Sequence, residues 1–161
     1  MTKLEKAELD QFDVELLRQM QLDCQQSSTA LSAKIALSPT AIQRRLKRLR
    51  NEGYIRSEHA ILEPTKLGSF LQLLVMLRLK KGGREINSAV LSRLDGLAQV
   101  QQCYAVTGEY DFVLMMVVRD MAEYDALCKR IFQAHDDVER YETTVIMESV
   151  KQSFALPLSL N

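Results

Sequence analysis

The stretch LSAKIALSPTAIQRRLKRLRNEGYI (Leu31–Ile55) decides how the first part of the chain folds. Ser38 is a favoured helix N-cap, and Pro39 suits the first helical position, where its missing N–H would have no partner. Apolar residues then recur at helical spacing, at Ile42, Leu46 and Leu49. This pattern predicts an amphipathic helix that begins after Ser38 and ends near Gly53.

Two further helices are predicted before this one. Ser27 and Ser28 supply caps for a short helix over residues 29–35, and Asp10 can cap an earlier helix. The apolar residues of that earlier helix are Leu9, Phe12, Leu16 and Met20. Because only about three residues separate the second and third helices, the segment predicts a helix-turn-helix, whose second helix enters the DNA major groove. Residues 54–62 predict a small two-stranded wing after it.

Basic charge is concentrated in the same segment, although the 161-residue chain has a net charge of zero. Residues 34–56 hold seven cations and one anion, and five of the cations lie within residues 44–50. Such a cluster is typical of a phosphate-binding surface, although a run of charge is more often a solvated helix face. The surface opposite the apolar stripe carries Thr40, Gln43, Arg44, Lys47 and Arg48. A solvated face usually mixes signs and this one scarcely does, so we expect a surface that binds DNA.

The second half of the chain has the pattern of an α+β domain. Apolar runs predict four strands, at residues 70–79, 99–107, 111–119 and 140–149. Amphipathic spacing around Val90 predicts one helix, and Asp120 followed by Glu123 begins another like a capping box. The order is β-α-β-β-α-β, the ferredoxin-like split motif. We therefore expect a winged helix-turn-helix over residues 1–62, a linker over 63–69 and a βαββαβ domain over 70–161.

A continuous apolar run from Phe112 to Val118 predicts self-association. Two helices cover only one face of a four-stranded sheet, and a solvated second face would make the strands alternate between polar and apolar residues. We therefore expect the second face to pack on another copy of the chain. A homodimer also suits a helix-turn-helix, since two recognition helices can read two half-sites.

Three stretches together resemble the Lrp/AsnC family, the feast/famine transcriptional regulators. They are the helix-turn-helix stretch Leu31–Ile55, the G-x-x-D stretch VTGEYDF (Val106–Phe112) and the last-strand stretch VIMESVK (Val145–Lys151). The resemblance runs from about Leu9 to Ser153, almost the whole chain. It implies dimers that assemble into octamers or related rings, with a small amino acid bound between dimers that shifts assembly or DNA affinity.

The resemblance also implies two sets of binding residues. The DNA-contacting set is Ser38, Pro39, Thr40, Gln43, Arg44, Arg45, Lys47 and Arg48. The effector-binding set is Thr107, Gly108, Glu109, Tyr110, Asp111, Met121, Thr144, Val145 and Ile146. The chain departs from the family pattern in three places: Ala36 replaces the usual turn glycine, residues 135–137 (HDD) replace a Pro-Gly before the last strand, and Thr144 replaces an aromatic residue. The third change alters the size and polarity of the pocket, which leaves the effector open.

Gly108 and Asp111 have a physical case of their own. Glycine lets the backbone approach a ligand closely, and the Asp111 carboxylate could receive the α-ammonium of an amino acid. The alternative is that Gly-x-x-Asp only closes a hairpin, with Asp111 bonding turn amides. The residues alone favour that alternative, and the resemblance favours the effector site. Apolar Met121, Val145 and Ile146 suggest leucine or methionine, whereas Thr144 would suit a polar effector.

The sequence argues against several other classes of protein. The two histidines lie far apart and the three cysteines are widely spaced, so we expect no catalytic residues, no metal site and no cofactor. The charged N-terminus lacks a signal-peptide pattern, and no apolar run is long enough to span a membrane. We therefore expect a cytoplasmic, nucleoid-associated regulator that binds double-stranded DNA and responds to an amino acid. The alternative is an architectural DNA-binding protein with no effector.

Overall fold

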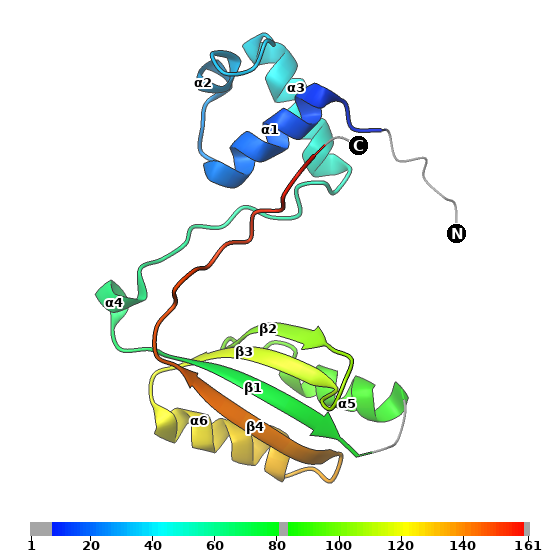
Figure 1. The fold of residues 1–161 in the computed structure, drawn as a ribbon, viewed down its shortest axis with the longest axis vertical. Helices are drawn as coiled ribbons and strands as arrows, with labels where there is room; N and C mark the ends of the chain where they lie inside the picture. Colours follow the sequence, from blue (N-terminus) through cyan, green and yellow to red (C-terminus); the bar gives the residue numbers. More distant parts are fainter. Residues whose placement is uncertain (1–7, 81–83, 160–161) are drawn as a thin grey trace. The chain divides into compact units, whose positions relative to one another are not determined.

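The computed structural model describes residues 8–80 and 84–159, which fall into two compact units (Figure 1). Unit 1 comprises Met1–Ile61 together with Lys151–Asn161, and unit 2 comprises Leu62–Val150. The predicted domain boundaries also include residues 1–7, 81–83 and 160–161, which lie outside the described residues. No helix in the described ranges is long and apolar enough to cross a membrane.

Unit 1 is built from three capped helices, as the sequence predicts. They are α1 (Gln11–Leu22), α2 (Ser28–Ser32) and α3 (Pro39–Asn51). Asp10 caps α1 in a capping box with Asp13, and the Ser27 and Ser38 hydroxyls accept backbone N–H groups at the starts of α2 and α3. Their apolar faces form one core, which comprises Leu16, Leu17, Met20, Leu31, Ile35, Ile42, Leu46 and Leu49.

The turn between α2 and α3 accommodates alanine where the family pattern has glycine. No described residue other than glycine has a positive φ, so Ala36 needs no left-handed backbone conformation. The helix-turn-helix geometry is therefore reached without the usual turn glycine.

The predicted two-stranded wing is wrong as a strand pair. Residues 56–63 have no regular secondary structure and are exposed, and a four-residue helix, α4 (Pro64–Leu67), follows within the predicted linker. Only Tyr54 and Ile55 pack against the unit 1 core. A hairpin with no buried face is at best marginally stable, which explains why this segment does not form a ladder.

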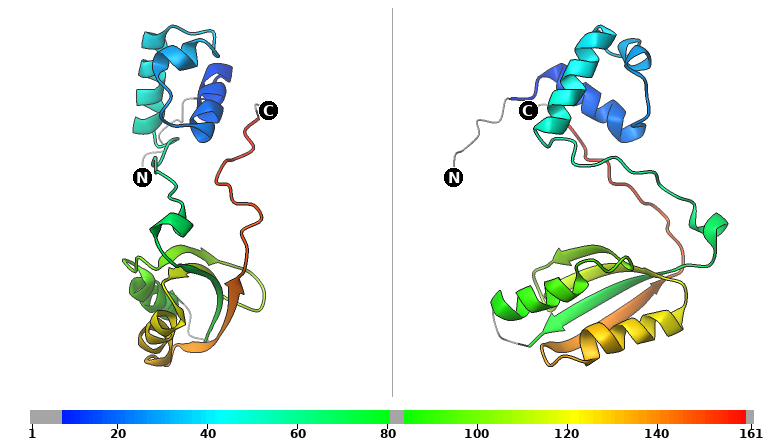
Figure 2. Two further views of the ribbon diagram at one scale, coloured as in Figure 1. Left: turned by 90° about the vertical axis from the view of Figure 1, so that its left-hand side faces the viewer. Right: turned by 180° about the vertical axis from the view of Figure 1, so that it is seen from behind.

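Unit 2 has the predicted βαββαβ order. Its elements are β1 (Leu71–Leu79), α5 (Arg84–Leu94), β2 (Val100–Ala105), β3 (Phe112–Val118), α6 (Met121–Cys128), the π-helical turn η1 (Lys129–Gln133) and β4 (Val138–Ile146). The strands pair antiparallel in the order β2-β3-β1-β4. Both α5 and α6 lie on the same face of the sheet (Figure 2).

The central strand β3 is apolar on both faces of the sheet, but the two faces differ in burial. Side chains alternate along β1 and β3, and every second one enters the core beneath the helices, as Leu73 and Leu114 do. The side chains between them, such as Met76 and Val113, are only half-buried. The continuous apolar run of β3 therefore supplies a covered face and an open face.

The last described residues of the chain pack with unit 1 rather than with unit 2. β4 ends at Ile146, and residues 151–161 belong to unit 1 rather than unit 2. The Arg18 guanidinium on α1 donates to the Leu158 carbonyl at 2.6 Å, and Gln21 exchanges hydrogen bonds with the Leu156 backbone. Leu158 also packs against the unit 1 core. The C-terminal segment is thus part of the helical unit.

Candidate nucleic-acid interface and effector loop

The outer face of α3 is the surface that helix packing leaves exposed. The helix begins at Ser38, whose hydroxyl accepts the Ala41 N–H at 3.3 Å, and its apolar stripe is buried. Six of the eight predicted DNA-contacting residues are exposed: Ser38, Pro39, Thr40, Gln43, Arg44 and Lys47. These side chains can meet a ligand without any rearrangement of the core.

Arg44 and Lys47 carry the free positive charge of this face. They lie three residues apart on the same side of α3, and within residues 8–80 and 84–159 neither has a carboxylate within ion-pair distance. Gln43, beside them, donates to the Ser28 hydroxyl on α2 at 3.2 Å. A phosphate oxygen would therefore meet two cations with no internal partner to displace.

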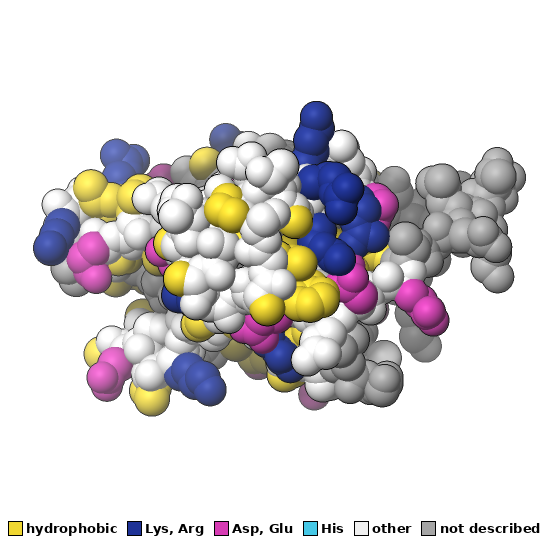
Figure 3. Space-filling view, turned by 90° about the horizontal axis from the view of Figure 1, so that it is seen from above, with side chains coloured by type: hydrophobic (Ala, Val, Ile, Leu, Met, Phe, Trp, Pro, Cys, Tyr) yellow, Lys and Arg dark blue, Asp and Glu magenta, His cyan; other side chains and the backbone are white. Residues whose placement is uncertain are grey.

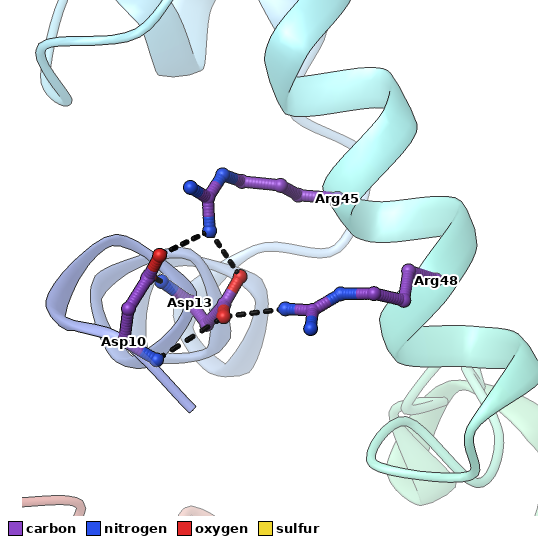
Figure 4. A network of polar contacts seen from close by, with 4 residues as sticks. All are labelled: Asp10, Asp13, Arg45 and Arg48. Atoms are coloured by element: carbon purple, nitrogen blue, oxygen red, sulfur yellow. Dashed lines mark hydrogen bonds and ion pairs between the residues drawn. The ribbon is translucent and has the colours of Figure 1, made fainter. Parts of the chain in front are cut away.

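Arg45 and Arg48 are placed differently from the rest of the predicted set. Their guanidinium groups point from α3 to the carboxylates of Asp10, the N-cap of α1, and Asp13, on α1 (Figure 4). Arg45 Nη1 lies 2.7 Å from Asp10 Oδ2 and 2.8 Å from Asp13 Oδ1, and Arg48 Nη2 lies 2.5 Å from Asp13 Oδ2. The structure therefore does not bring these two arginines together with the exposed residues of the outer face.

Asp13 is the centre of this network and is almost completely buried, with a relative exposure of 1%. Burial alone raises the pKa of its carboxyl, but hydrogen bonds from Arg48 and Arg45 outweigh burial, so the pKa lies below its usual value. In turn, the hydrogen bonds that both guanidinium groups donate to Asp13 raise the pKa of Arg45 and of Arg48. Asp13 is thus a buried anion that α3 neutralises.

The basic cluster is therefore less basic than a count of residues indicates. Arg50 pairs with Glu58 at 2.8 Å, so three of the five cations within residues 44–50 have carboxylate partners. Figure 3 shows Lys and Arg side chains gathered on one part of the surface, with Asp and Glu side chains beside them. Sequence reasoning missed the α1 acids. The sequence does hold one sign of this contact: Asp10 and Asp13 are three residues apart, as are Arg45 and Arg48.

The predicted effector loop lies between β2 and β3 in unit 2. Gly108 has a φ of 119°, a backbone conformation that side chains other than glycine rarely adopt. The Asp111 carboxylate accepts the Leu79 N–H at 2.7 Å, and the Asp111 backbone pairs with Leu77 and Val106. One carboxylate oxygen thus anchors the loop to the end of β1 rather than to a turn amide.

Arg140 on β4 contacts two side chains of the same loop. It donates to Glu109 Oε1 at 2.7 Å and to the Tyr110 hydroxyl at 3.0 Å, and its guanidinium lies 5.5 Å from the centre of the Tyr110 ring. Arg78 on β1 adds a longer ion pair with Glu109, at 3.8 Å. These contacts are exposed, so they position the loop without burying it.

Strand register divides the predicted effector residues into two groups. Phe112, next to the loop, pairs with Leu77, whereas Thr144, Val145 and Ile146 pair with Leu74, Leu73 and Gln72. Five residues of strand separate Gln72 from Leu77, which corresponds to roughly 17 Å. Met121 follows the end of β3 that lies near Gln72. Within one chain, therefore, Ile146 and Met121 lie toward the end of the sheet opposite the loop, whereas Thr144, opposite Leu74, lies roughly 10 Å along the strand from Leu77.

Comparisons with known proteins agree with both units. Residues 9–56 match a family model described as winged helix-turn-helix DNA-binding, and residues 72–156 match one described as the Lrp/AsnC ligand binding domain. The leucine-responsive regulatory protein of Haemophilus influenzae is 34% identical over 158 residues, which cover 98% of this chain and 95% of that protein. An uncharacterized HTH-type transcriptional regulator of Sinorhizobium fredii is 37% identical over 153 residues, covering 95% and 90%.

Solved structures give the same result. A transcriptional regulator of Neisseria meningitidis in complex with L-methionine matches with a TM-score of 0.86 at 26% identity, covering 93% of this chain and 97% of that one. A feast or famine regulatory protein of M. tuberculosis complexed with L-methionine matches with a TM-score of 0.83 at 26% identity, covering 92% and 99%. The chain belongs to the Lrp/AsnC family and is a DNA-binding transcriptional regulator with a ligand-binding domain, like relatives that are regulators rather than enzymes.

Proposed function

We propose that this regulator binds double-stranded DNA sequence-specifically through the outer face of α3, and that a small amino acid bound to unit 2 changes its DNA affinity or assembly. The observation that carries the DNA-binding part is the exposed pair Arg44 and Lys47, which has no carboxylate partner in the described residues. Such a protein acts on nucleoid DNA in the cytoplasm.

The proposed DNA-contacting set is narrower than the resemblance implies. Arg45 and Arg48 are left out because α1 already neutralises them. Arg44 and Lys47 supply phosphate contacts or reach guanine edges, and the shorter polar side chains of α3 read neighbouring bases. The proposed set is Ser38, Pro39, Thr40, Gln43, Arg44 and Lys47.

A salt titration of single variants tests this surface. If Arg44 or Lys47 contacts a phosphate, its replacement by alanine lowers the slope of log affinity against log salt by about 0.9. If one of them instead makes a bidentate contact with guanine, the loss is about 1–3 kcal/mol at a single base position. Arg50→Ala is the matched control, since Arg50 is an exposed α3 cation already paired with Glu58. Unchanged affinity and slope in both Arg44→Ala and Lys47→Ala would contradict the proposed surface.

The effector part of the proposal requires more than one copy of the chain. Ile146 lies roughly 17 Å along the sheet from the level of the loop around Gly108, which is farther than one small amino acid reaches within a single protomer. A site between copies can combine the loop of one with the strand end of another. The half-buried apolar side chains on the open face of β3 support a homodimer, and dimers would then assemble into an octamer or a similar ring.

The side chains around the two groups favour an apolar amino acid. Met121 and Val145 are 48% and 40% exposed, although both are large and hydrophobic. The second carboxylate oxygen of Asp111 can receive an α-ammonium, since Leu79 occupies only the first. Leucine and methionine fit this description, and two related structures are complexes with L-methionine.

Thermal unfolding in the presence of each of the twenty amino acids tests the effector part. A ligand that binds only the folded state stabilises it by about 2.7 kcal/mol at a hundred times its Kd. We expect an apolar amino acid to raise the melting temperature of the parent protein and to have less effect on Asp111→Asn. If no amino acid shifts either melting or DNA affinity, the architectural alternative replaces the effector-responsive one.

A further inference from the structure

The network of Asp10, Asp13, Arg45 and Arg48 joins α1 to the recognition helix without contributing to its exposed face. Two carboxylates and two guanidinium groups meet there, so their formal charges cancel. Half of the four cations at positions 44, 45, 47 and 48 are therefore already neutralised inside the protein. The network needs an explanation, because a DNA-binding helix gains affinity from every cation that it exposes.

Because Asp13 is buried, its ion pairs with Arg45 and Arg48 are costly to break. Each of its oxygens accepts a hydrogen bond from a different arginine, and its relative exposure is 1%. If either arginine left for a phosphate, it would leave a buried carboxylate with half of its compensation. Asp10, which is half-exposed, adds a second carboxylate contact to Arg45. The two arginines are thus held more firmly than a surface ion pair would hold them.

Arg48 is close enough to the outer face to matter if it were free. It lies four residues after Arg44, which places the two side chains on neighbouring turns of the same side of α3. Its side chain is 33% exposed even while it is paired with Asp13. The Arg45 side chain is less exposed, at 22%, and its guanidinium lies 5.6 Å from the centre of the Phe12 ring.

We propose that Asp10 and Asp13 withhold Arg45 and Arg48 from DNA phosphates and so act as specificity-determining residues of the recognition helix. Affinity for DNA of any sequence rises with the number of phosphates neutralised, whereas contacts to base edges set discrimination. Two carboxylates inside the protein lower the affinity for DNA of any sequence and leave the contacts to base edges unchanged. This inference rests on the proposed DNA-binding face of α3.

The test measures affinity of the full chain for a random-sequence duplex at several salt concentrations. In Asp13→Asn, the buried carboxylate no longer holds Arg48, and Arg45 keeps only its contact with half-exposed Asp10, so the log–log salt slope becomes steeper by about 0.9 for each new phosphate contact in a bound domain. Each contact corresponds to an additional change of about 3.5-fold in affinity between 50 and 200 mM salt. Glu15→Gln is the matched control, since it removes an equal charge from α1, and its partner Arg18 lies on α1 as well. Its slope stays at the parent value.

A second substitution separates released arginines from a general change of charge. In Asp13→Asn combined with Arg45→Gln and Arg48→Gln, the slope returns to the parent value if the arginines cause the increase. If the slope stays steep in this combination, or does not change in folded Asp13→Asn, the proposal is overturned.

Two further single variants keep the question answerable if Asp13→Asn does not fold. Arg45→Gln and Arg48→Gln in the parent protein leave the salt slope unchanged under the proposal, whereas a loss of about 0.9 in either would overturn it. Arg44→Gln reports separately on the DNA-binding face: an unchanged slope there would contradict the proposed function rather than the role of the acid pair.

Discussion

The two units of this regulator present their candidate sites in different ways. In unit 1, the exposed residues of the DNA-binding face come from one continuous helix and its cap, over residues 38–47. In unit 2, the predicted effector residues come from a loop and from β4, whose Ile146 lies toward the opposite end of the sheet. The proposed DNA-binding face is complete in a single chain, whereas the proposed effector site needs residues from a second copy. The difference suggests that DNA contact belongs to the protomer and effector binding to the assembly.

If the two units are independent, each unfolds with its own core. Disrupting one of these cores gives the largest expected change in stability. Leu49 in α3 and Leu73 in β1 are both fully buried, but in different clusters. Leu49→Ala should destabilise unit 1 by about 3 kcal/mol and leave unit 2 unchanged, and Leu73→Ala should do the reverse. Calorimetric unfolding of the full chain would show which transition moves. Equal loss from both transitions in either variant would show that the cores are not independent.

Strain at the effector loop gives the next effect. Gly108 has a φ of 119°, so Gly108→Ala should cost unit 2 about 2 kcal/mol and weaken its response to an amino acid. Gly96, with a φ of 76°, is a matched control in the turn before β2. Gly96→Ala should also destabilise unit 2 but leave the response intact. If Gly108→Ala responds to the amino acid as fully as the parent does, the loop is not part of the effector site.

One carboxylate in each unit should make the stability of that unit depend on pH. Hydrogen bonds from Arg93 lower the pKa of Asp137 in unit 2, and the pKa of Asp13 in unit 1 is lowered as well, despite its burial. A carboxyl whose folded pKa is depressed stabilises the fold above its unfolded pKa of about 4, and that stability is lost as pH falls through the folded pKa.

Both units should therefore lose stability below about pH 4, at about 1.4 kcal/mol for each unit of pKa depression. Asp13→Asn should flatten the acid response of unit 1 alone, and Asp137→Asn that of unit 2 alone. Denaturant unfolding between pH 2 and pH 7 would measure both. An acid response of unit 1 that persists in Asp13→Asn would assign it to other groups.

The C-terminal segment gives the smallest expected effect. Arg18 and Gln21 hold it to α1 through hydrogen bonds with exposed partners, and such bonds contribute little. Arg18→Ala should therefore lower the stability of unit 1 by about 1 kcal/mol, as measured by denaturant unfolding. A loss larger than about 3 kcal/mol would mean that the segment is integral to the unit 1 core.

Local signals in the sequence predicted most of the fold. Ser38 and Pro39 fix the start of α3, and alternating or continuous apolar runs identify the four strands. The residues alone, in contrast, predicted a wing over 54–62, because alternation was visible but the absence of a burying surface was not. The place of residues 151–161 depends on Leu158 finding a distant core, which no local pattern encodes.

The candidate sites were predictable to different depths. Helical periodicity places Arg44 and Lys47 on the outer face of α3, but it cannot reveal that α1 neutralises Arg45 and Arg48. That contact depends on how two helices pack. Similarly, the sequence names both halves of the effector set, but only strand register shows how far apart along the sheet they lie.

The central claim is that unit 1 binds DNA through α3 while unit 2 senses an amino acid. The most direct test is the affinity for selected operator DNA, with and without the amino acid that stabilises the protein most, in the parent, Arg44→Ala and Asp111→Asn. Asparagine can still accept the Leu79 N–H, so Asp111→Asn keeps the loop but loses the charge.

We expect the amino acid to change the DNA affinity of the parent by at least about fivefold. Arg44→Ala should bind DNA more weakly but keep the same fold-change in affinity on adding the amino acid. Asp111→Asn should bind DNA as the parent does but lose that fold-change. An unchanged affinity of the parent with every amino acid, or the full fold-change in Asp111→Asn, would contradict the account.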